Sequence, residues 1–294
     1  MKLAAVRTRS GQAIGIVSDD AHTIRVLPAS SGSVDDVVRG VATFGTIARH
    51  AAAVDPVPVE SVDLAAPLAQ FNRDILCTGW NYLDHFYESA GKREGQDPDS
   101  MPSRPTFFTK GPDTVIGPND PIAYDEQLSA KWDYEAEIAI VIGREGRSIR
   151  EEDAWDHVFG FLLANDVSQR DMQRAYGGQW LKGKSVDQTM PLGPWITTLD
   201  EIPRVGELPI ECELNGVTMQ RATAGQMAFS IPRIIAELSW GMTLHAGDIV
   251  LTGTPSGIGN AREPAVFLQA GDTLVTRGGP LGALRNPIVR TTLS

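Results

Sequence analysis

The segment 131–143, KWDYEAEIAIVIG, constrains the fold of this chain more than any other stretch of the sequence. Its apolar residues alternate with Asp133, Glu135 and Glu137, and this period of two predicts a β-strand. Beyond Glu137 the residues are apolar on both faces, which is typical of a strand that lies mostly buried. Residues two apart on a strand share a face, so the two glutamate side chains would project to the same side, about 7 Å apart.

These paired glutamates have two interpretations. Like charges on one partly buried face repel each other and are costly to remove from water. A divalent cation between them would relieve both costs, because carboxylate oxygens are the ligands that Mg²⁺, Mn²⁺ and Ca²⁺ prefer. An exposed sheet edge with an acidic pattern would account for the same residues. Taken alone, the segment favours the exposed edge, so the rest of the chain has to distinguish the two.

Composition narrows the classes of protein to which the chain can belong. The formal net charge of −11 opposes binding to nucleic acid or to an anionic membrane surface. Cys77 and Cys212 are the only cysteines, too few for a disulfide framework or a thiolate metal site, which predicts a reducing compartment. The first residues lack the apolar core of a signal peptide, and no stretch is long enough to span a membrane. We therefore expect a soluble cytoplasmic protein.

Turn signals and periodicity divide the chain into two parts. Residues 1–70 contain three short strands and two amphipathic helices, which predicts a small N-terminal α+β domain. Residues 71–294 are rich in strands and poor in helices, so we expect a larger α+β domain, mainly β, with a rolled or barrel-like mixed sheet. Within it we predict a hairpin at Asn215-Gly216, a helix over 231–240, and a last strand pair over 266–269 and 273–276.

A histidine and a glutamate precede a long polar segment. His85 and Glu88 are three residues apart, which would place them on one face of a helical turn. The polar segment 89–105 follows, and loops of this length are usually lids or disordered. A histidine oriented by a carboxylate at the base of a lid could act as a general base. On spacing alone, an ordinary surface pair is favoured.

Two more segments place charged residues beside apolar ones. The run 158–164 predicts a buried strand, and Asp166 follows it, either as a metal ligand or near the N-cap of a helix that begins there. In the segment 179–185, Lys182 and Lys184 would share a face if the chain were extended. Neither pattern identifies a site by itself.

Six motifs occur in a fixed order along the second part of the chain. Together they resemble the fumarylacetoacetate hydrolase (FAH) superfamily over roughly residues 71–294, and in particular its shorter members. These members include acylpyruvate hydrolases, oxaloacetate decarboxylases, diketo-acid hydrolases and homoprotocatechuate-pathway isomerase/decarboxylases. The motifs are NYLDH-x-x-E (81–88), FFTKGPDTVIGPND (107–120), DYEAEIAIVIG (133–143), NDVSQRDMQ (165–173), QWLKGKSVDQTMPLGP (179–194) and LTGTPSGIG (251–259).

The resemblance implies a fold, a metal and a homodimer. It implies the FAH-type rolled sheet, and one Mg²⁺ or Mn²⁺ ion, with Ca²⁺ as an alternative ion in a crystal. The substrate would be a small anionic 2-oxo or diketo acid. Trp80 occupies a position that varies in the family, and its bulk could narrow the substrate pocket. The residues that match the family's motifs are Glu135, Glu137 and Asp166 as metal ligands, His85 and Glu88 as a catalytic dyad on a mobile lid, Lys184 as a catalytic and substrate-binding lysine, and Arg170, Gln173, Thr254 and, less directly, Lys110 as substrate contacts.

The chemistry of such a site fits three reactions. Cleavage of a C–C bond beside a carbonyl, and loss of CO₂ from a 2-oxo acid, both develop an enolate that a divalent ion and a lysine stabilise. We expect hydrolysis of an acylpyruvate or 2,4-diketo acid. The alternatives are decarboxylation of oxaloacetate or a related diacid, and keto–enol isomerisation of an aromatic ring-cleavage product.

Other classes of protein explain less of the sequence. A phosphate loop in TGTPSGIG would need the G-x-G-x-x-G spacing or a G-K-[ST] ending, and the segment has neither. Ser256 follows a proline without the nucleophile elbow of a serine hydrolase. A non-catalytic metal-binding module with the same fold is the remaining rival.

Overall fold

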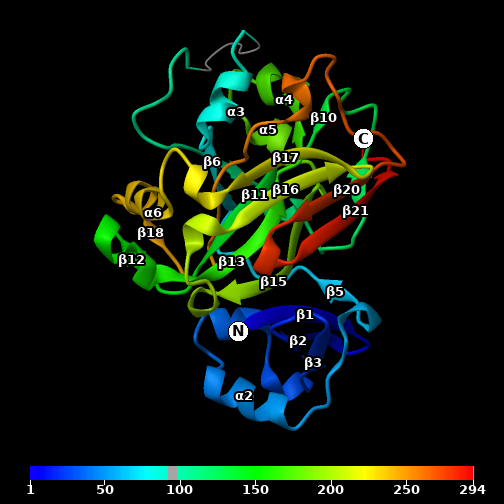
Figure 1. Cartoon of the computed structure of the whole chain (residues 1–294), viewed down its shortest axis with the longest axis vertical. Coiled ribbons are helices and arrows are strands. Elements are labelled where there is room, and N and C mark those ends of the chain that lie inside the picture. The colour runs from blue at the N-terminus through cyan, green and yellow to red at the C-terminus, as the bar shows by residue number, and fades with distance from the viewer. Residues whose placement is uncertain (92–97, 294) are drawn as a thin grey trace.

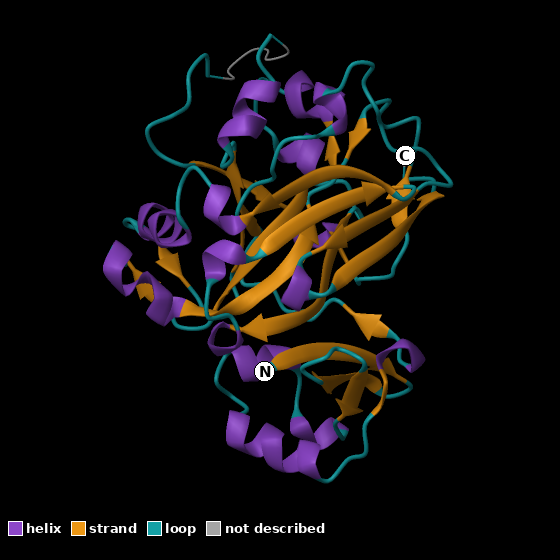
Figure 2. Ribbon diagram, in the orientation of Figure 1, coloured by secondary structure: helices purple, strands orange, loops and turns teal. Residues whose placement is uncertain are grey.

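The computed structural model describes residues 1–91 and 98–293, so residues 92–97 of the predicted lid segment lie outside the described part. Two sheets, one of twelve strands and one of five, make up most of the molecule (Figures 1 and 2). Short helices surround them and lie at the two ends in this view. The architecture is mixed α+β and mainly sheet, as expected, without a closed barrel. No helix in the described ranges is long and apolar enough to cross a membrane.

The larger sheet runs through most of the length of the molecule (Figure 1). Its neighbouring strands are antiparallel, apart from two parallel pairs. In sheet order it contains β4 (Val57–Pro58), β3 (Thr23–Val26), β2 (Gly11–Val17), β1 (Lys2–Thr8), β15 (Met190–Thr198), β13 (Val158–Asn165), β11 (Ala136–Ile142), β19 (Ile249–Leu251), β6 (Ile75–Gly79) and β7 (Thr106–Lys110), with β5 (Leu64–Ala65) beside β1 and β8 (Val115–Ile116) beside β15.

The smaller sheet and the helices complete the fold. In order, the five strands are β17 (Val217–Thr223), β16 (Pro209–Leu214), β20 (Thr273–Arg277), β21 (Ala283–Arg290) and β9 (Ile122–Tyr124). Two further pairs are β10 (Trp132–Asp133) with β14 (Ser168–Gln169), and β12 (Gly146–Arg147) with β18 (Thr243–Leu244). The α-helices are α1 (Val34–Val38), α2 (Phe44–Ala52), α3 (Leu83–Glu88), α4 (Arg170–Ala175), α5 (Leu181–Lys184) and α6 (Ile231–Ser239).

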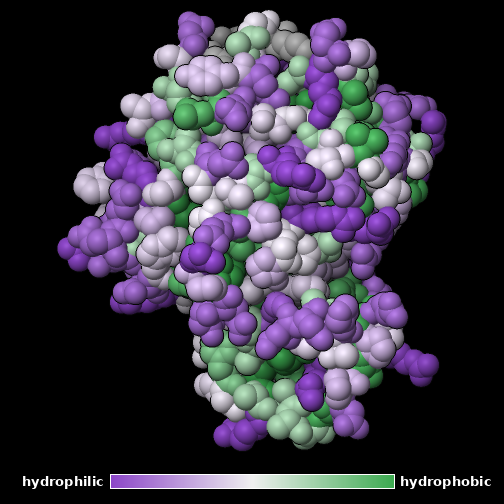
Figure 3. Space-filling model, in the orientation of Figure 1, coloured by the Kyte–Doolittle hydropathy of each residue, from purple (hydrophilic) through white to green (hydrophobic). Residues whose placement is uncertain are grey.

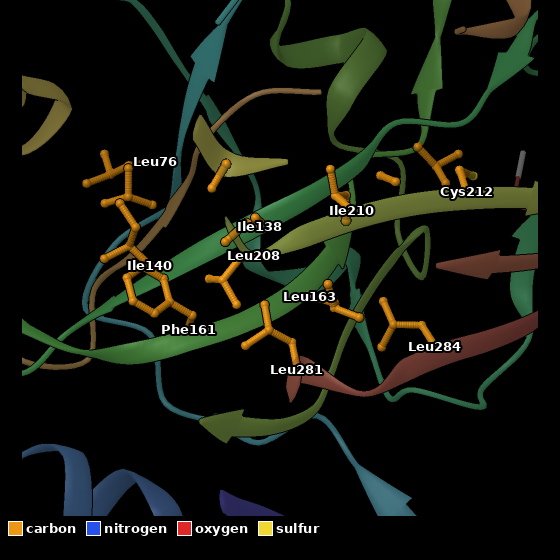
Figure 4. Close-up of a cluster of buried hydrophobic side chains, with 14 of the residues drawn as sticks. Leu76, Ile138, Ile140, Phe161, Leu163, Leu208, Ile210, Cys212, Leu281 and Leu284 are labelled. Carbon is orange, nitrogen blue, oxygen red and sulfur yellow. The ribbon is translucent and has the colours of Figure 1, made fainter. Parts of the chain in front are cut away.

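The main core lies between the two sheets (Figure 4). Alternate residues of β11 and β13, including Ile138 and Leu163, belong to one buried cluster with Ile210 and Leu284 of the smaller sheet. Burying an aliphatic side chain of this size contributes about 1.5–3 kcal/mol. The other face of β11, which carries Ala139, belongs to a second cluster. Both faces of β11 are thus buried, which confirms the prediction of an interior strand and removes the exposed-edge interpretation.

The predicted strand 131–143 is interrupted just before this buried stretch. β10 ends at Asp133, and β11 begins at Ala136. In the gap, the Glu135 N–H donates to the Asn165 side-chain oxygen at 3.0 Å, and its carbonyl accepts from the Asp166 N–H at 2.8 Å. Side-chain and loop hydrogen bonds therefore replace the strand ladder at Glu135.

Two other expectations from the sequence are wrong. The helix after the apolar run begins at Arg170 with Gln169 as its N-cap, so Asp166 caps no helix and lies between β13 and β14. No strand forms over 266–269, because β20 pairs with β16 and β21 on its two edges, and the Val266 and Leu268 N–H groups donate to the carbonyls of Gly259 and Trp132 instead. β21 alternates buried and exposed residues, a signal that the sequence analysis overlooked.

The predicted hairpin and helix are both confirmed. Asn215 and Gly216 join β16 to β17 with φ angles of 52° and 80°, as a two-residue turn between twisted strands requires. Helix α6 has Pro232 in its first turn. Its N-cap is Ser230, whose hydroxyl accepts from the Arg233 N–H at 3.3 Å.

The N-terminal residues extend the larger sheet. Strand β1 pairs antiparallel with β15 through Lys2 and Leu3, so one sheet runs through both predicted domains. The division at residue 70 therefore stays a prediction. Figure 3 shows hydrophilic side chains over much of the upper part of the visible face, with apolar ones gathered on the N-terminal part below. Exposed apolar residues in the N-terminal part include Val41 and Phe44.

The close pairing of β13 with β15 gives a stability prediction. A Cβ atom at Gly160 would lie 2.3 Å from the carbonyl oxygen of Thr197, so Gly160→Ala must displace backbone. We expect a loss of about 1–3 kcal/mol in the free energy of unfolding, measured by urea denaturation. The control, Gly45→Ala in α2, would meet nothing closer than Thr43 Oγ1 at 4.0 Å and should gain up to about 1 kcal/mol. Equal stabilities for the two variants would contradict this packing.

Candidate active site and metal centre

Three carboxylates converge in the interior. Candidate ligand atoms of Glu135, Glu137 and Asp166 all lie within 4.8 Å of one another, and all three residues are buried. Glu137 projects from β11, Glu135 from the break before it, and Asp166 from the end of the neighbouring strand β13. Three buried oxygen ligands that face one point suit a hard divalent cation such as Mg²⁺ or Mn²⁺.

Two lysines neutralise part of this acidic cluster. The Lys184 ammonium lies 2.7 Å from Glu135 Oε2 and 2.6 Å from Asp166 Oδ2. The Lys110 ammonium lies 2.9 Å from Asp166 Oδ1 and donates to the Val167 carbonyl at 2.8 Å. Both lysines are almost fully buried, so each depends on these partners for the hydrogen bonds that water would otherwise provide.

Arg170 is the third cation of the cluster. Its guanidinium lies 2.6 Å from Glu135 Oε1 and donates to Asp133 Oδ2 at 2.8 Å. It also donates to Gln173 Oε1 at 3.2 Å, which fixes the amide group of that residue. Asp133 in turn accepts from the backbone N–H groups of Gly259 and Asn260, so this carboxylate orients the arginine.

The electrostatic environment shifts the pKa values of Glu135 and Glu137 in opposite directions. Burial disfavours the charge of Glu135, but Lys184, Arg170 and His85 outweigh it and hold the pKa of this carboxyl below its usual value. Burial, together with Asp166 and Glu135, raises the pKa of Glu137 instead. Glu137 also accepts from the Gly253 N–H at 2.6 Å. A bound divalent ion would therefore compete with a proton at Glu137.

Lys184 remains charged in this setting. Burial alone would lower the pKa of its ammonium, but Asp166 and Glu135 reverse this effect and raise the pKa. The segment that carries Lys184 is the short helix α5, not an extended chain, so Lys182 is exposed while Lys184 points into the site. The chain is therefore not extended here, and the two lysines do not share a face.

His85 and Glu88 form a hydrogen-bonded pair on α3. The imidazole Nδ1 lies 2.7 Å from Glu88 Oε1, and Glu88 Oε2 accepts from the Gly257 N–H at 2.7 Å. The glycine-rich loop thus fixes the carboxylate that orients the histidine. Because Nδ1 is occupied, Nε2 is the ring nitrogen that can exchange a proton with a ligand.

A cavity of about 40 Å³ adjoins these groups. Most of the predicted residues line it, whereas Asp166, Lys110 and Glu88 do not. Sequence reasoning missed the aromatic residues on one side of the cavity, of which only Trp80 was noted, and it missed Arg174, one turn after Arg170. The polar and aromatic side chains that line it include His85, Glu135, Glu137, Arg170, Gln173, Arg174, Lys184, Thr254, Trp80, Phe108 and Trp180.

Thr254 lines the cavity, but its hydroxyl is engaged. Its Oγ1 donates to the Ala136 carbonyl at 3.0 Å and accepts from Gln220 Nε2 at 2.8 Å. The single hydroxyl proton is thus committed to the backbone, and a contact with a substrate carboxylate would have to replace that bond. The substrate role of Thr254 stays a prediction. Gln220, which also accepts from the Ala136 N–H at 3.0 Å, was not predicted.

The fold and the site define an enzyme with a buried carboxylate centre of the kind that binds divalent cations. The family described as Fumarylacetoacetate (FAA) hydrolase C-terminal matches residues 74–289. The chain belongs to this family, which confirms the resemblance drawn from the sequence motifs.

Relatives and solved structures agree with this assignment. The chain is 42% identical over 230 residues to the oxaloacetate tautomerase YisK of Bacillus subtilis, spanning 78% of this chain and 74% of that protein. It is 39% identical over 253 residues to the human mitochondrial oxaloacetate tautomerase FAHD2A, spanning 85% and 77%.

Among solved structures, a fumarylacetoacetate hydrolase from Exiguobacterium antarcticum superimposes with a TM-score of 0.85 at 31% identity, over 99% of this chain and 100% of that one. A maleylpyruvate hydrolase from Sphingobium sp. SYK-6, in complex with manganese and pyruvate, has a TM-score of 0.79 at 27% identity and the same coverage.

The carboxylate triad, formed by Glu135, Glu137 and Asp166, gives a prediction about metal binding. Glu137→Gln keeps the shape of the side chain and removes its charge, so we expect Mn²⁺ affinity to fall at least about 100-fold, measured by isothermal titration calorimetry. The exposed Glu60→Gln is the matched control and should bind like the wild type. Wild-type affinity in Glu137→Gln would exclude the triad as the metal site.

The raised pKa of Glu137 gives a prediction about pH. The folded metal-free chain keeps a proton that the unfolded chain releases, so stability falls as pH rises from the usual glutamate value of 4.5 towards the raised pKa. In chelator, between about pH 5 and pH 8, the wild type should lose stability more steeply than Glu137→Gln. Urea unfolding at each pH tests this expectation, and parallel curves for the two proteins would contradict it.

Proposed function

We propose that this protein is a metal-dependent keto–enol isomerase that acts on a small 2-oxo diacid of the oxaloacetate type. The observation that carries the proposal is the similarity, over more than three-quarters of the chain, to proteins named oxaloacetate tautomerases. The reaction type is that of the isomerase alternative drawn from the sequence, and the substrate is that of the decarboxylase alternative. Hydrolysis, the first expectation, becomes the second candidate.

The site contains groups suited to moving one proton. Tautomerisation transfers a proton between C3 and the 2-oxo oxygen through an enolate. A divalent ion held by Glu135, Glu137 and Asp166 would polarise the 2-oxo group and stabilise the enolate charge. His85, held at Nδ1 by Glu88, would take the proton from C3 at Nε2 and deliver it to the former 2-oxo oxygen, and it would move the proton back to C3 in the reverse reaction. The Lys184 ammonium, which stays charged, would lie beside the developing negative oxygen.

The charge of the site supports an anionic substrate. Asp133 and the triad carry four negative charges when ionised, and Lys110, Lys184 and Arg170 carry three positive ones. A divalent ion would change this balance from net negative to net positive. An anionic acid would compensate the charge of the loaded site, whereas a neutral ligand would not.

A specific observation supports hydrolysis as the second candidate. The Gly257 N–H fixes Glu88, and this arrangement orients His85 equally well to deprotonate a water molecule. Both reactions share the enolate, so the same residues would serve either. The distinction lies in whether water reaches a second carbonyl of the substrate.

The proton-transfer role of His85 is tested by substitution. In His85→Gln we expect the enzymatic rate of oxaloacetate tautomerisation, followed by the absorbance of the enol, to fall about 10²–10⁴-fold, with Mn²⁺ affinity unchanged. The control is His245→Gln, because His245 forms the same kind of pair, 2.7 Å from Glu145, on the exposed surface. A His85→Gln enzyme with the wild-type rate would exclude this role.

The same assays separate the candidate reactions. The wild type should exchange the two forms of oxaloacetate faster than it releases pyruvate or CO₂, with both products measured by mass spectrometry. Rapid release of pyruvate from an acylpyruvate, without accelerated tautomerisation, would favour the hydrolase. Release of CO₂ that keeps pace with enol consumption would favour the decarboxylase.

A further inference from the structure

We propose that Trp80 and Trp180 form a wall that limits the length of the substrate, so that the site accepts short 2-oxo acids and excludes those with bulky distal groups. This inference rests on the proposed function, because it describes the substrate range of the same site. The catalytic cavity and a neighbouring cavity share three aromatic lining residues.

The catalytic cavity has a neighbour that is lined by uncharged residues. A second cavity of about 210 Å³ is lined by Thr106, Phe107, Gln179 and other residues, none of which is charged. Trp80, Phe108 and Trp180 line both cavities and therefore stand between them.

The wall is built from edge-to-face aromatic contacts. The rings of Trp80 and Trp180 are 4.7 Å apart at 88°, and those of Phe108 and Trp180 are 5.0 Å apart at 63°. Trp80 also meets Phe86 of α3, edge to face at 6.3 Å. Such pairs contribute about 0.5–1.5 kcal/mol each beyond the area they bury, so the rings are held in place.

The wall is tied to the catalytic residues on both sides. Trp180 is the N-cap of α5, one turn before Lys184, and the Lys184 ammonium lies 5.0 Å from the centre of the Phe108 ring. Phe86 is the neighbour of His85 on α3. Helices α3 and α5 lie near each other at the upper end of the molecule (Figure 1). Phe86 and Trp180 thus lie on or beside the same short helices as His85 and Lys184.

The backbone of β6 is adapted to this arrangement. A Cβ atom at Gly79 would lie 2.8 Å from the Trp180 ring, so only glycine lets the indole pack over the strand. Trp80 has a φ of 51°, in the left-handed region that costs a non-glycine residue about 1–2 kcal/mol. The contacts of the Trp80 ring offset this cost. Replacing Trp80 by glycine would remove the ring and relieve the backbone at once.

The two cavities differ in the chemistry that they would bind. The catalytic side offers Lys184, Arg170 and Arg174 to anionic groups. The far side offers aromatic surface and no charge, which suits a flat apolar group. A short diacid would remain on the charged side. A 2-oxo acid with an aromatic tail would need the space that the wall closes off.

The test compares two probes on the Mn²⁺-loaded protein by isothermal titration calorimetry. Oxalate represents the charged end alone, and phenylpyruvate adds a flat apolar group. Trp180→Ala and Trp80→Gly should each bind phenylpyruvate about 10-fold more tightly than the wild type, while their oxalate affinities change less than about threefold. Trp180→Phe should lie between. Trp240→Ala, at a residue that is 79% exposed on another surface, is the control and should match the wild type.

The outcomes separate this inference from the proposed function. If neither Trp180→Ala nor Trp80→Gly gains affinity for phenylpyruvate relative to oxalate, the wall does not limit size. The inference is then wrong, whatever the wild type does with oxaloacetate. If the selective gain appears but the wild type does not tautomerise oxaloacetate, the wall stands and the proposed function fails. Thermal unfolding of each variant, with a wild-type-like transition, ensures that binding is compared between folded proteins.

Discussion

The structure depends on the burial of three carboxylates where two neighbouring strands of the larger sheet begin and end. Glu135, Glu137 and Asp166 would repel one another in this low-dielectric setting, so the protein surrounds them with compensating groups. Lys110 and Lys184, themselves almost fully buried, are held there by the same carboxylates. The buried ammonium groups and the buried carboxylates thus lie in direct contact and compensate each other. A divalent ion would join a cluster that is already organised for charge.

This compensation determines the local form of the chain. The break between β10 and β11 allows the Glu135 backbone to bond to Asn165 and Asp166. These bonds hold the start of β11 beside the end of β13. The next residues of both strands return to regular pairing and to the apolar core. An irregular backbone is thus confined to the site, and the packed sheets on either side keep it in place.

The same centre explains why fold and family leave the reaction open. Carboxylates, lysine and a histidine–glutamate pair stabilise an enolate and move a proton, and several reactions of 2-oxo acids need both. What distinguishes these reactions is the shape of the space around the enolate. In this chain Trp80, Trp180 and Phe108 line one side of the cavity, and Trp180 caps the short helix that carries Lys184. The proposed size limit and the proposed role of Lys184 therefore depend on the same short helix.

The sequence by itself determined the interior strand, the hairpin at Asn215-Gly216 and the helix after Ser230, because periodicity and turn chemistry are local signals. Motif order nominated the residues of the candidate site, and the structure brings Glu135, Glu137 and Asp166 together. The N-cap interpretation of Asp166 and the strand over 266–269 were wrong, because these conformations depend on distant partners. Only the tertiary structure decided that Glu135 and Glu137 have opposite pKa shifts, that the Thr254 proton is committed to Ala136, and that Trp180 stands beside Trp80. These properties arise from residues that are far apart along the chain, and no spacing between neighbours encodes them.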